Sequence, residues 1–572
     1  MQFCVWAPLA TKSVELVCAD QRFAMVADDE GYWRIDCTPE RIASGYRFAV
    51  DGGPPLPDPR SRWQPEGVHG PSFVVDAGEL RAISRSDFRQ KPLREAVIYE
   101  LHVGTFTPEG TYAGAQRRLP HLSALGVTHI ELMPLATFPG RHGWGYDGVY
   151  LFAPQPSYGT PAELAQFVAA AHAQGMAVLL DVVYNHLGPD GNYLGQFGPY
   201  FTDRVRTGWG EAVNYDGPYS DGVRRFVIDN ARTWLEDYGF DGLRLDAVHA
   251  IYGFEAVHVL EELAAQIQTW AAQADRSVVL IAESDLNDPR LVRSRGAGGY
   301  GLDAHWEDDF HHALHRVMTG ETSGYYMDFN GINDLAISLR DAYVYRGQYS
   351  PHRRRRHGRA PLDVRPEQLV VSAQNHDQIG NRAQGERLSM LLNDMQLKAV
   401  AALTILSPFV PMLFQGEEWG ARTPFLYFTD HQDRELGKLV AQGRRKEFES
   451  FGWQTEVPDP QAASTFERSR LNWEELAQSG HQDLLDWYRR LIVLRASTIR
   501  PPSGAAEVVY EEPSSWLTFV LGDLCVAVNF AGESVPFALP AGHWRLLMTS
   551  AQPHADSARL AAYETRIHIR GP

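Results

Sequence analysis

The segment GLRLDAVH, residues 242–249, carries two charged residues within an apolar stretch that is typical of a buried β-strand. Arg244 and Asp246 are two residues apart, so their side chains should face the same side of such a strand. A guanidinium group next to a carboxyl group stabilises the ionised carboxylate. The segment therefore predicts a carboxylate that is held ionised at the end of a buried strand, which is the state that a nucleophile needs.

Seven further apolar stretches resemble this segment, and helical stretches such as PAELAQFVAAAHAQG, residues 161–175, lie between them. The eight candidate strands are VIYELHV (97–103), HIELMPL (129–135), AVLLDVV (177–183), GLRLDAV (242–248), VVLIAES (278–284), GLDAHW (301–306), LVVSAQN (369–375) and PMLFQG (411–416). Strands that alternate with helices in this way favour the α/β class and a parallel (β/α)8 TIM barrel. The helical stretch at residues 481–498 would close this barrel.

The two ends of the chain show a different pattern from the predicted barrel. Residues 1–90 contain short runs of alternating apolar and polar residues, interrupted by Gly, Pro and Asp, which predicts a small β-sandwich. Residues 501–572 return to strand-like runs, which predicts an antiparallel β-domain. We therefore expect three domains, with the barrel at residues 91–500 between the two β-domains.

Composition restricts the class of partner and the compartment. The chain has 572 residues and a formal net charge of -18, which argues against nucleic acid or an anionic membrane as the partner. Its four cysteines form no Cys-x-x-Cys pair, which disfavours a disulfide scaffold and a zinc site. The N-terminus lacks the pattern of a signal peptide, and no stretch resembles a transmembrane span. We therefore expect a cytoplasmic protein.

Three carboxylates follow predicted strands and should meet at one end of the barrel. Asp246 lies at the end of the fourth strand, Glu283 lies at the end of the fifth, and Asp377 follows the seventh. A barrel of this kind builds its active site at the carboxyl ends of its strands. Glu283 follows the apolar run SVVLIA, and an apolar pocket would raise its pKa toward that of a general acid. Each carboxylate alone could simply cap a strand or pair with a surface lysine. Together, the three carboxylates favour an active site. Two of them, Asp246 and Glu283, would have different pKa values, and glycosidic cleavage requires such a pair of carboxyl groups.

Four motifs resemble the conserved regions of the α-amylase family of glycoside hydrolases. They are DVVYNH (181–186), GLRLDAVH (242–249), IAES (281–284) and QNHDQIGN (374–381), and they occur in the order typical of that family. The resemblance covers about residues 95–500. The N-terminal sandwich is similar to the carbohydrate-binding-like module of branching and debranching members.

The resemblance implies a role for each motif residue. Asp246 corresponds to the nucleophile, Glu283 to the acid/base, and Asp377 to the residue that distorts the sugar and stabilises the transition state. The resemblance further implies substrate contacts at Tyr146, His186, Trp209, Arg244, His249, Asp308, Asp309, His311 and His376. Asp308, Asp309 and His311 lie in HWEDDFHH, residues 305–312, for which the alternative is a helix N-terminus that is capped by an aspartate.

Other charged or polar residues are interpreted as structural. His129 should pack on its strand, Asp181 should hold loop structure, and Glu417 and Glu418 should support the rim after the eighth strand. The basic patch HRRRRHGR, residues 352–359, is expected to be a solvated loop, or alternatively a positive lip near the site.

Within the family, the motifs are most similar to members that hydrolyse the α-1,4 bond next to the terminal trehalose of maltooligosyltrehalose. Such members act after a maltooligosyltrehalose synthase and release trehalose. A glucan branching enzyme is the main alternative, but Ser284 and Asn375 stand where that enzyme normally has Glu and Ser. A non-catalytic glucan-binding protein is the other alternative, and the three carboxylates disfavour it. The resemblance implies no cofactor and no metal, because the loop that follows Asn185 is short for a calcium site.

Overall fold

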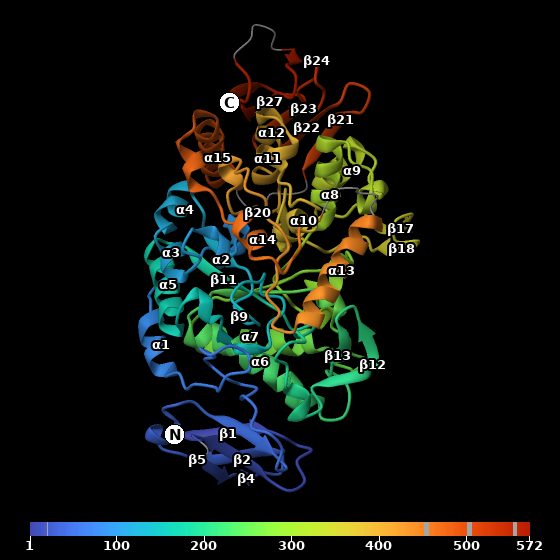
Figure 1. Cartoon of the computed structure of the whole chain (residues 1–572). Coiled ribbons are helices and arrows are strands. Elements are labelled where there is room, and N and C mark those ends of the chain that lie inside the picture. The colour runs from blue at the N-terminus through green and yellow to red at the C-terminus, as the bar shows by residue number, and fades with distance from the viewer. Residues whose placement is uncertain (20, 451–456, 500–505, 553–557, 572) are drawn as a thin grey trace.

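The chain folds into three regions that follow one another in space as they do in sequence (Figure 1). The computed structural model describes residues 1–19, 21–450, 457–499, 506–552 and 558–571. A small set of N-terminal strands lies at one end, the barrel with its helices occupies the centre, and the C-terminal strands lie at the opposite end (Figure 1). This arrangement agrees with the predicted order of β-sandwich, barrel and antiparallel β-domain.

Eight parallel strands form a closed barrel in the middle of the chain, and each is hydrogen-bonded to its neighbours in chain order. They are β7 (Ile98–Leu101), β8 (His129–Leu132), β11 (Ala177–Val182), β14 (Gly242–Leu245), β15 (Val279–Ala282), β16 (Ala304–Trp306), β19 (Leu369–Ser372) and β20 (Val410–Phe414). Each strand overlaps one of the eight predicted stretches. The prediction of an α/β protein with a (β/α)8 barrel is therefore confirmed.

Helices surround the barrel and connect most of its strands (Figure 1). The longer ones are α5 (Pro161–Ala173), α6 (Ser220–Asp237), α7 (Val259–Gln273), α8 (Asp308–Thr319), α9 (Ile332–Asp341), α12 (Asp394–Ile405), α13 (Arg434–Ser450) and α15 (Ser479–Thr498). The shorter ones are α1 (Ala77–Ser84), α2 (Val103–Phe106), α3 (Tyr112–Gln116), α4 (Leu119–Leu125), α10 (His376–Gly380), α11 (Leu388–Leu391) and α14 (Ala463–Arg468). The predicted closing helix lies within α15. No helix in the described ranges is long and apolar enough to cross a membrane.

One strand–helix unit departs from the expected alternation. The connection from β15 to β16 contains two 3-10 turns, Pro289–Leu291 and Arg295–Ala297, in place of an α-helix. The segment GAGGYG, residues 296–301, holds four glycines, which lose much conformational entropy in a helix. Pro289 also cannot donate a backbone hydrogen bond. The sequence of this connection therefore explains why the fifth strand is followed by turns.

The N-terminal strands form two three-stranded antiparallel sheets, ordered β1-β5-β4 and β3-β2-β6. Their bounds are β1 (Gln2–Trp6), β2 (Val14–Cys18), β3 (Gln21–Ala24), β4 (Val26–Ala27), β5 (Tyr32–Asp36) and β6 (Arg47–Val50). Val14, Leu16 and Phe48 are fully buried in the core of this unit. The predicted domain limit at residue 90 falls between β6 and the first barrel strand, and it stays a prediction.

The C-terminal region is a five-stranded antiparallel sheet ordered β21-β22-β23-β27-β25, with a separate two-stranded pair. The bounds are β21 (Glu507–Glu511), β22 (Trp516–Leu521), β23 (Leu524–Asn529), β25 (Trp544–Thr549) and β27 (Thr565–Arg570), with the pair β24 (Val535–Pro536) and β26 (Arg559–Leu560). The antiparallel β prediction for this region is confirmed. The predicted limit between residues 500 and 501 lies outside the described residues.

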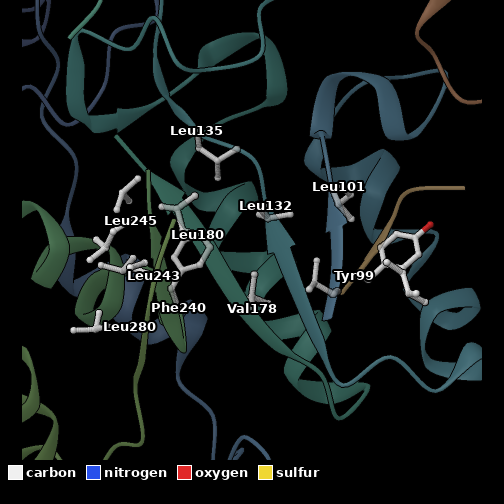
Figure 2. Packing of buried hydrophobic residues seen from close by; sticks show 14 of the residues in the cluster. Tyr99, Leu101, Leu132, Leu135, Val178, Leu180, Phe240, Leu243, Leu245 and Leu280 are labelled. Carbon is white, nitrogen blue, oxygen red and sulfur yellow. The ribbon is translucent and has the colours of Figure 1, made fainter. Parts of the chain in front are cut away.

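Alternation along the barrel strands sends one set of side chains toward the helices and the other set into the barrel interior. Figure 2 shows residues of the outer set, including Leu180 and Leu243, packed between strands and helices. Leu179 and Ile281, which have the opposite parity, belong to a second apolar cluster inside the barrel. Arg244 shares the parity of the inner set, so its charge lies inside the barrel and close to the strand ends.

We predict that Gly242→Ala lowers the free energy of unfolding by about 1–3 kcal/mol, because its position on β14 leaves no space for a side chain. A Cβ atom at Gly242 would lie 2.5 Å from the backbone oxygen of Val279 and 2.8 Å from Leu179 Cδ2. The strand must therefore shift to accommodate a methyl group. Differential scanning calorimetry of the wild type and the variant measures the effect.

Gly296→Ala is the matched control for this substitution, because a Cβ atom there meets no atom within 4 Å. We expect it to change the free energy of unfolding by less than about 0.5 kcal/mol. Equal unfolding temperatures for the two variants would contradict the tight packing of β14 against its neighbours.

Candidate active site

A cavity of about 650 Å³ lies at the carboxyl ends of the barrel strands. All three predicted catalytic carboxylates line it, namely Asp246, Glu283 and Asp377. The predicted substrate-binding residues in its wall are Tyr146, His186, Trp209, Arg244, His249 and His376. The structure thus brings nine sequence-predicted residues together, although they come from segments that are far apart in the chain.

Arg244 is the centre of this site. Its Nη1 donates to Asp181 Oδ2 at 2.7 Å and to Asp246 Oδ1 at 2.8 Å, and its Nη2 lies 3.7 Å from Glu283 Oε2. The guanidinium group lies over the ring of Trp306, 4.2 Å from its centroid. One cation on β14 therefore interacts with three carboxyl groups and an aromatic face. The prediction that Arg244 and Asp246 face the same space is confirmed.

Asp246 has a second partner that the sequence reasoning missed. Asn185 donates from Nδ2 to Asp246 Oδ2 at 3.0 Å, and its Oδ1 lies 2.7 Å from Nδ1 of His186. Both carboxylate oxygens of Asp246 are therefore hydrogen-bonded, which holds the group in one orientation. The available signal was the place of Asn185 next to His186 in the motif DVVYNH.

Glu283 lies in the setting that a general acid needs. The backbone N–H of Ala247 donates to Glu283 Oε2 at 2.5 Å, and Ala247 has a φ of +38°, which is costly for a residue other than glycine. Burial raises the pKa of Glu283 well above its usual range, Arg244 opposes this, and the charge of Asp246 adds to it. The carboxyl group is therefore favoured in its protonated form, which is the direction expected from the apolar run before it.

Asp377 projects into the cavity from the first turn of α10. The side chain of Asn375 caps this helix by accepting hydrogen bonds from the backbone N–H groups of Asp377 and Gln378. Asn381 donates from Nδ2 to Asp377 Oδ1 at 2.6 Å. The cap and this bond fix the direction of the carboxylate, and Asn381 is a further supporting residue that the motif contained but the sequence reasoning did not identify.

His376 is held between Glu100, on the barrel strand β7, and Tyr146, which lies in a turn. Glu100 on β7 accepts from the backbone N–H of His376 at 3.0 Å and lies 2.5 Å from its Nδ1. On the other side, His376 Nε2 lies 2.8 Å from the hydroxyl of Tyr146, which also donates to Asp181 at 2.6 Å. Burial by itself lowers the pKa of His376, but the Glu100 carboxylate outweighs it and the net shift is upward. The charge within the apolar stretch VIYELHV was the sequence signal for Glu100.

Aromatic rings form one wall of the cavity. Trp209 lies at the turn between β12 (Phe201–Thr207) and β13 (Gly210–Val213), and it stacks on His186 with ring centroids 4.5 Å apart and planes 9° apart. Trp209 is 54% exposed, so its free face is available to a ligand. Tyr146 stacks on His376, with centroids 5.2 Å apart. Flat apolar faces of this kind suit sugar rings.

Two of the predicted substrate-binding residues lie behind the cavity wall. Asp309 is buried, and its Oδ2 accepts from Asn287 Nδ2 and from the backbone N–H groups of Val344 and Tyr345. These bonds anchor two loops, and Asp309 does not line the cavity. The interpretation of Asp309 as a trehalose contact is therefore corrected to a structural role.

The same correction applies to His311, whose Nδ1 lies 2.7 Å from the carbonyl oxygen of Ala373 and whose Nε2 lies 3.0 Å from the hydroxyl of Tyr326. Asp308 is half-buried and does not line the cavity, and burial raises its pKa to about 7. The helix that begins at Asp308 is capped by Glu307, which accepts from Phe310 N–H, and not by an aspartate.

The residues interpreted as structural are buried as expected. His129 and Glu418 are fully buried, and Glu417 is 5% exposed. Glu418 accepts from the hydroxyl of Tyr99, and Glu417 accepts from that of Tyr488. Among the residues that the structure describes, no group of three or more His, Cys, Asp or Glu side chains is arranged to hold a metal ion.

The basic patch at residues 352–359 forms the end of a hairpin, β17 (Arg346–Ser350) and β18 (Arg355–Gly358). Arg353 donates to Oδ2 of Asp285 at 2.7 Å, and Asp285 lies two residues after Glu283 in the chain. Arg355, in contrast, is exposed to solvent. Asp285 Oδ1 in turn lies 3.9 Å from Nδ1 of His249 in the cavity wall. The patch is thus a solvated hairpin whose first arginine reaches the edge of the site.

A carboxyl group without a partner lies inside the barrel below the site. Glu131 on β8 is 1% exposed, and neither of its carboxyl oxygens has a hydrogen-bond partner within the described chain. It pairs in register with Glu100 on β7. Burial raises the pKa of Glu131 well above its usual range, Glu100 and Asp181 raise it further, and Arg244 opposes them. Burial therefore favours the neutral form of Glu131 in the folded protein.

Comparisons with known proteins agree with this geometry. A family model for the alpha amylase catalytic domain matches residues 76–198. The chain is 47% identical to the malto-oligosyltrehalose trehalohydrolase of Rhizobium sp. (strain M-11), over 98% of this chain and 96% of that protein. It is 48% identical to the protein of the same name from Arthrobacter ramosus, over 100% of this chain and 98% of that protein. The crystal structure of a putative alpha amylase from Salmonella typhimurium superposes with a TM-score of 0.90 and 37% identity, covering 100% of this chain and 97% of that one.

We predict that Glu131→Gln raises the free energy of unfolding by an amount that grows with pH. Because folding favours the neutral form, the pKa of Glu131 is higher in the folded than in the unfolded chain. Below the pKa that Glu131 has in the unfolded chain, this group does not lower the free energy of unfolding of the wild type. As the pH rises from that value toward the higher pKa in the folded chain, the free energy of unfolding falls. The loss reaches about 1.4 kcal/mol per pH unit. Gln has the same shape and cannot ionise, so denaturant unfolding of both proteins across a pH series measures the difference.

Glu79→Gln, at an exposed position of α1, controls for the substitution itself and should show no comparable gain. If Glu131→Gln were instead less stable, with the largest loss near neutral pH, Glu131 would be an ionised partner of Arg244. That result would overturn the assignment of a neutral carboxyl group.

Proposed function

The chain belongs to the malto-oligosyltrehalose trehalohydrolases, glycoside hydrolases with an alpha amylase catalytic domain, and from that premise we propose the reaction at its barrel mouth. The proposed reaction is hydrolysis of the α-1,4-glucosidic bond next to the terminal trehalose of maltooligosyltrehalose. Its products are trehalose and a maltooligosaccharide. The observation that carries this proposal is the meeting of Asp246, Glu283 and Asp377 in one cavity around Arg244.

The proposed mechanism proceeds in two steps with retention of configuration. Glu283 donates its proton to the glycosidic oxygen while Asp246 attacks the anomeric carbon, and the trehalose half leaves. Glu283, now ionised, accepts a proton from water, and the resulting attack releases the sugar from Asp246. Asp377 binds the sugar at the cleavage point and stabilises the positive charge that develops on it.

Electrostatics supports this division of roles. Asp246 accepts hydrogen bonds on both oxygens, one of them from Arg244, so its carboxyl group is held in one orientation. Glu283 has a raised pKa because of burial, so it holds the proton that the first step needs. Both carboxyl groups lie within 4 Å of nitrogens of the same guanidinium group, at 2.8 Å and 3.7 Å. That closeness suits a retaining enzyme, in which the carboxyl groups are about 5–5.5 Å apart.

Substrate contacts are proposed for the remaining residues of the cavity wall. The free face of Trp209, the ring of Tyr146, and the imidazoles of His186, His249 and His376 all line it. Their rings and nitrogens offer stacking surfaces and hydrogen bonds to sugar hydroxyl groups. A site that pairs the hydroxyl groups of both trehalose rings would discriminate strongly against other leaving groups.

The proposal extends to the place of the reaction. Its substrate carries trehalose at the end of a maltooligosyl chain, so a maltooligosyltrehalose synthase must act before it. We place the enzyme in the cytoplasm, where its four free cysteines, Cys4, Cys18, Cys37 and Cys525, would remain reduced.

We predict that Asp246→Asn and Glu283→Gln each lower kcat by about 10³- to 10⁵-fold while the protein stays folded. The first change removes the nucleophile, and the second removes the proton donor. Single-turnover kinetics and circular dichroism measure activity and folding. Asp275→Asn, at a surface ion pair with Arg89, is the matched control and should retain wild-type kcat. Near-normal turnover in either active-site variant would refute its role.

We further predict that the protein releases trehalose from maltooligosyltrehalose and that the new reducing end first appears as the α-anomer. Chromatography identifies the products, and proton NMR early in the reaction identifies the anomer. New α-1,6 branches on amylose would instead indicate a branching enzyme, and unchanged substrate would indicate a glucan-binding protein. First appearance of the β-anomer would exclude the two-step mechanism.

A further inference from the structure

A hollow of about 430 Å³ lies at the amino-terminal end of the barrel, on the face opposite the active site. Its described lining comes from three segments, namely residues 91–97 before β7, residues 126–128 before β8, and residues 492–499 at the end of α15. We call this hollow the basal pocket. It shares no described lining residue with the cavity that holds the three catalytic carboxylates. A ligand in the basal pocket therefore stays apart from the bond that is cut.

One buried cation in the wall of the basal pocket has no carboxylate partner. Arg495 is 5% exposed, and its guanidinium group donates to the carbonyl oxygens of Ile405, Ser407 and Phe409 at 2.8, 2.9 and 2.5 Å. These bonds satisfy carbonyl groups between α12 and β20, but they leave the Nε–H of Arg495 without a partner in the described chain. Burial lowers the pKa of Arg495 to about 10, and no acidic side chain offsets this effect. Buried charges in proteins are normally paired, so Arg495 lacks a counter-ion.

Two further cations lie in the same wall, with a single carboxylate between them. Lys91 is exposed, and its ammonium group has no ion-pair partner among the residues that the structure describes. Arg94 Nη2 lies 3.7 Å from Oε1 of Glu95, which is the one acidic residue in the described lining. That lining thus carries three positive charges and one negative charge, in a chain whose net charge is -18. The local excess of positive charge attracts anions.

Much of the remaining lining is apolar. Val97, Ile492 and Ile499 are buried residues that offer an aliphatic surface beside the cations. A simple oxyanion would leave this surface uncovered, whereas an aliphatic chain attached to the oxyanion would cover it. The volume of the pocket is in the range of pockets that hold small organic molecules. The wall therefore suits an anion that has an apolar body.

We propose that the basal pocket binds a small organic anion, with its oxygen atoms on Lys91 and the Nε–H of Arg495 and its apolar chain against Val97 and Ile492. The carboxylate of a short fatty acid is the simplest ligand of this chemistry. It supplies the negative charge that Arg495 lacks within the chain. It also joins the segment before β7 to α15, and so links the first barrel strand to the closing helix. Binding therefore stabilises the folded chain and leaves the chemical step unchanged.

Isothermal titration of the full chain with hexanoate tests this proposal. We expect one site, no comparable heat with the neutral analogue hexanamide, and an unfolding temperature that rises with hexanoate concentration. Inorganic phosphate carries the charge but has no apolar chain, so it should bind about 10-fold more weakly. Equal binding of hexanoate and hexanamide would show that the cations take no part. Phosphate binding as tight as that of hexanoate would show that the apolar wall takes no part, and either result refutes the assignment.

Lys91→Glu is the variant that locates the site. The new carboxylate repels the ligand and offers Arg495 a partner within the chain, so hexanoate should bind about 10-fold more weakly. Because Lys91 is exposed, the unliganded variant should unfold at a temperature no lower than that of the wild type. Lys12→Glu, at an exposed position outside the basal pocket, makes the same change in net charge and should bind hexanoate like the wild type. Unaltered binding in Lys91→Glu would overturn the proposal.

Activity shows whether the anion acts at the basal pocket or at the active site. Saturating hexanoate should leave kcat and KM for maltooligosyltrehalose unchanged in the wild type and in Lys91→Glu. Competitive inhibition by hexanoate would place it in the catalytic cavity and would contradict the basal site. A wild type that released no trehalose would count against the proposed function alone, because hexanoate binding is measured without substrate.

Discussion

The buried guanidinium group of Arg244 is the interaction on which the catalytic end of this barrel depends. It joins Asp181 on the third strand, Asp246 after the fourth and Glu283 after the fifth, and it lies on the ring of Trp306. A buried cation that loses a partner costs about 3–5 kcal/mol. The carboxyl groups are therefore held close to the cation before any substrate arrives. The relative positions of Asp246 and Glu283 are set by their shared interaction with the positive charge of Arg244.

The same network extends to strands on the far side of the barrel. Asp181 also accepts from Tyr146, the hydroxyl of Tyr146 meets His376, and Glu100 holds His376 from below. Hydrogen bonds in such a chain strengthen one another in a low-dielectric interior. Loops that are separated by more than two hundred residues are thus tied to a single charged centre. Glu131 lies next to this network without a hydrogen bond to any described residue, and burial raises its pKa.

Polar residues near the cavity serve two different purposes. Those in the wall present rings, nitrogens and oxygens to the space where a sugar would lie. Asp309 instead gathers the backbone N–H groups of Val344 and Tyr345, and so fixes the start of the hairpin that carries Arg353 toward the site. Whether a polar residue contacts substrate or anchors the backbone depends on its position relative to the active-site cavity and not on its residue type.

The amino-acid sequence by itself determined the eight strands, the two flanking β-regions and the three carboxylates at the strand ends. These features depend on local periodicity and on covalent neighbours, which a single chain displays directly. Only the tertiary structure decided that Asn185 and Glu100 support the site while Asp309 and His311 are buried outside the lining of the cavity. Glu100 and His376 are 276 residues apart, and only the closure of the barrel makes them neighbours. A side chain's partner depends on which distant strand packs beside it, and no local pattern carries that information.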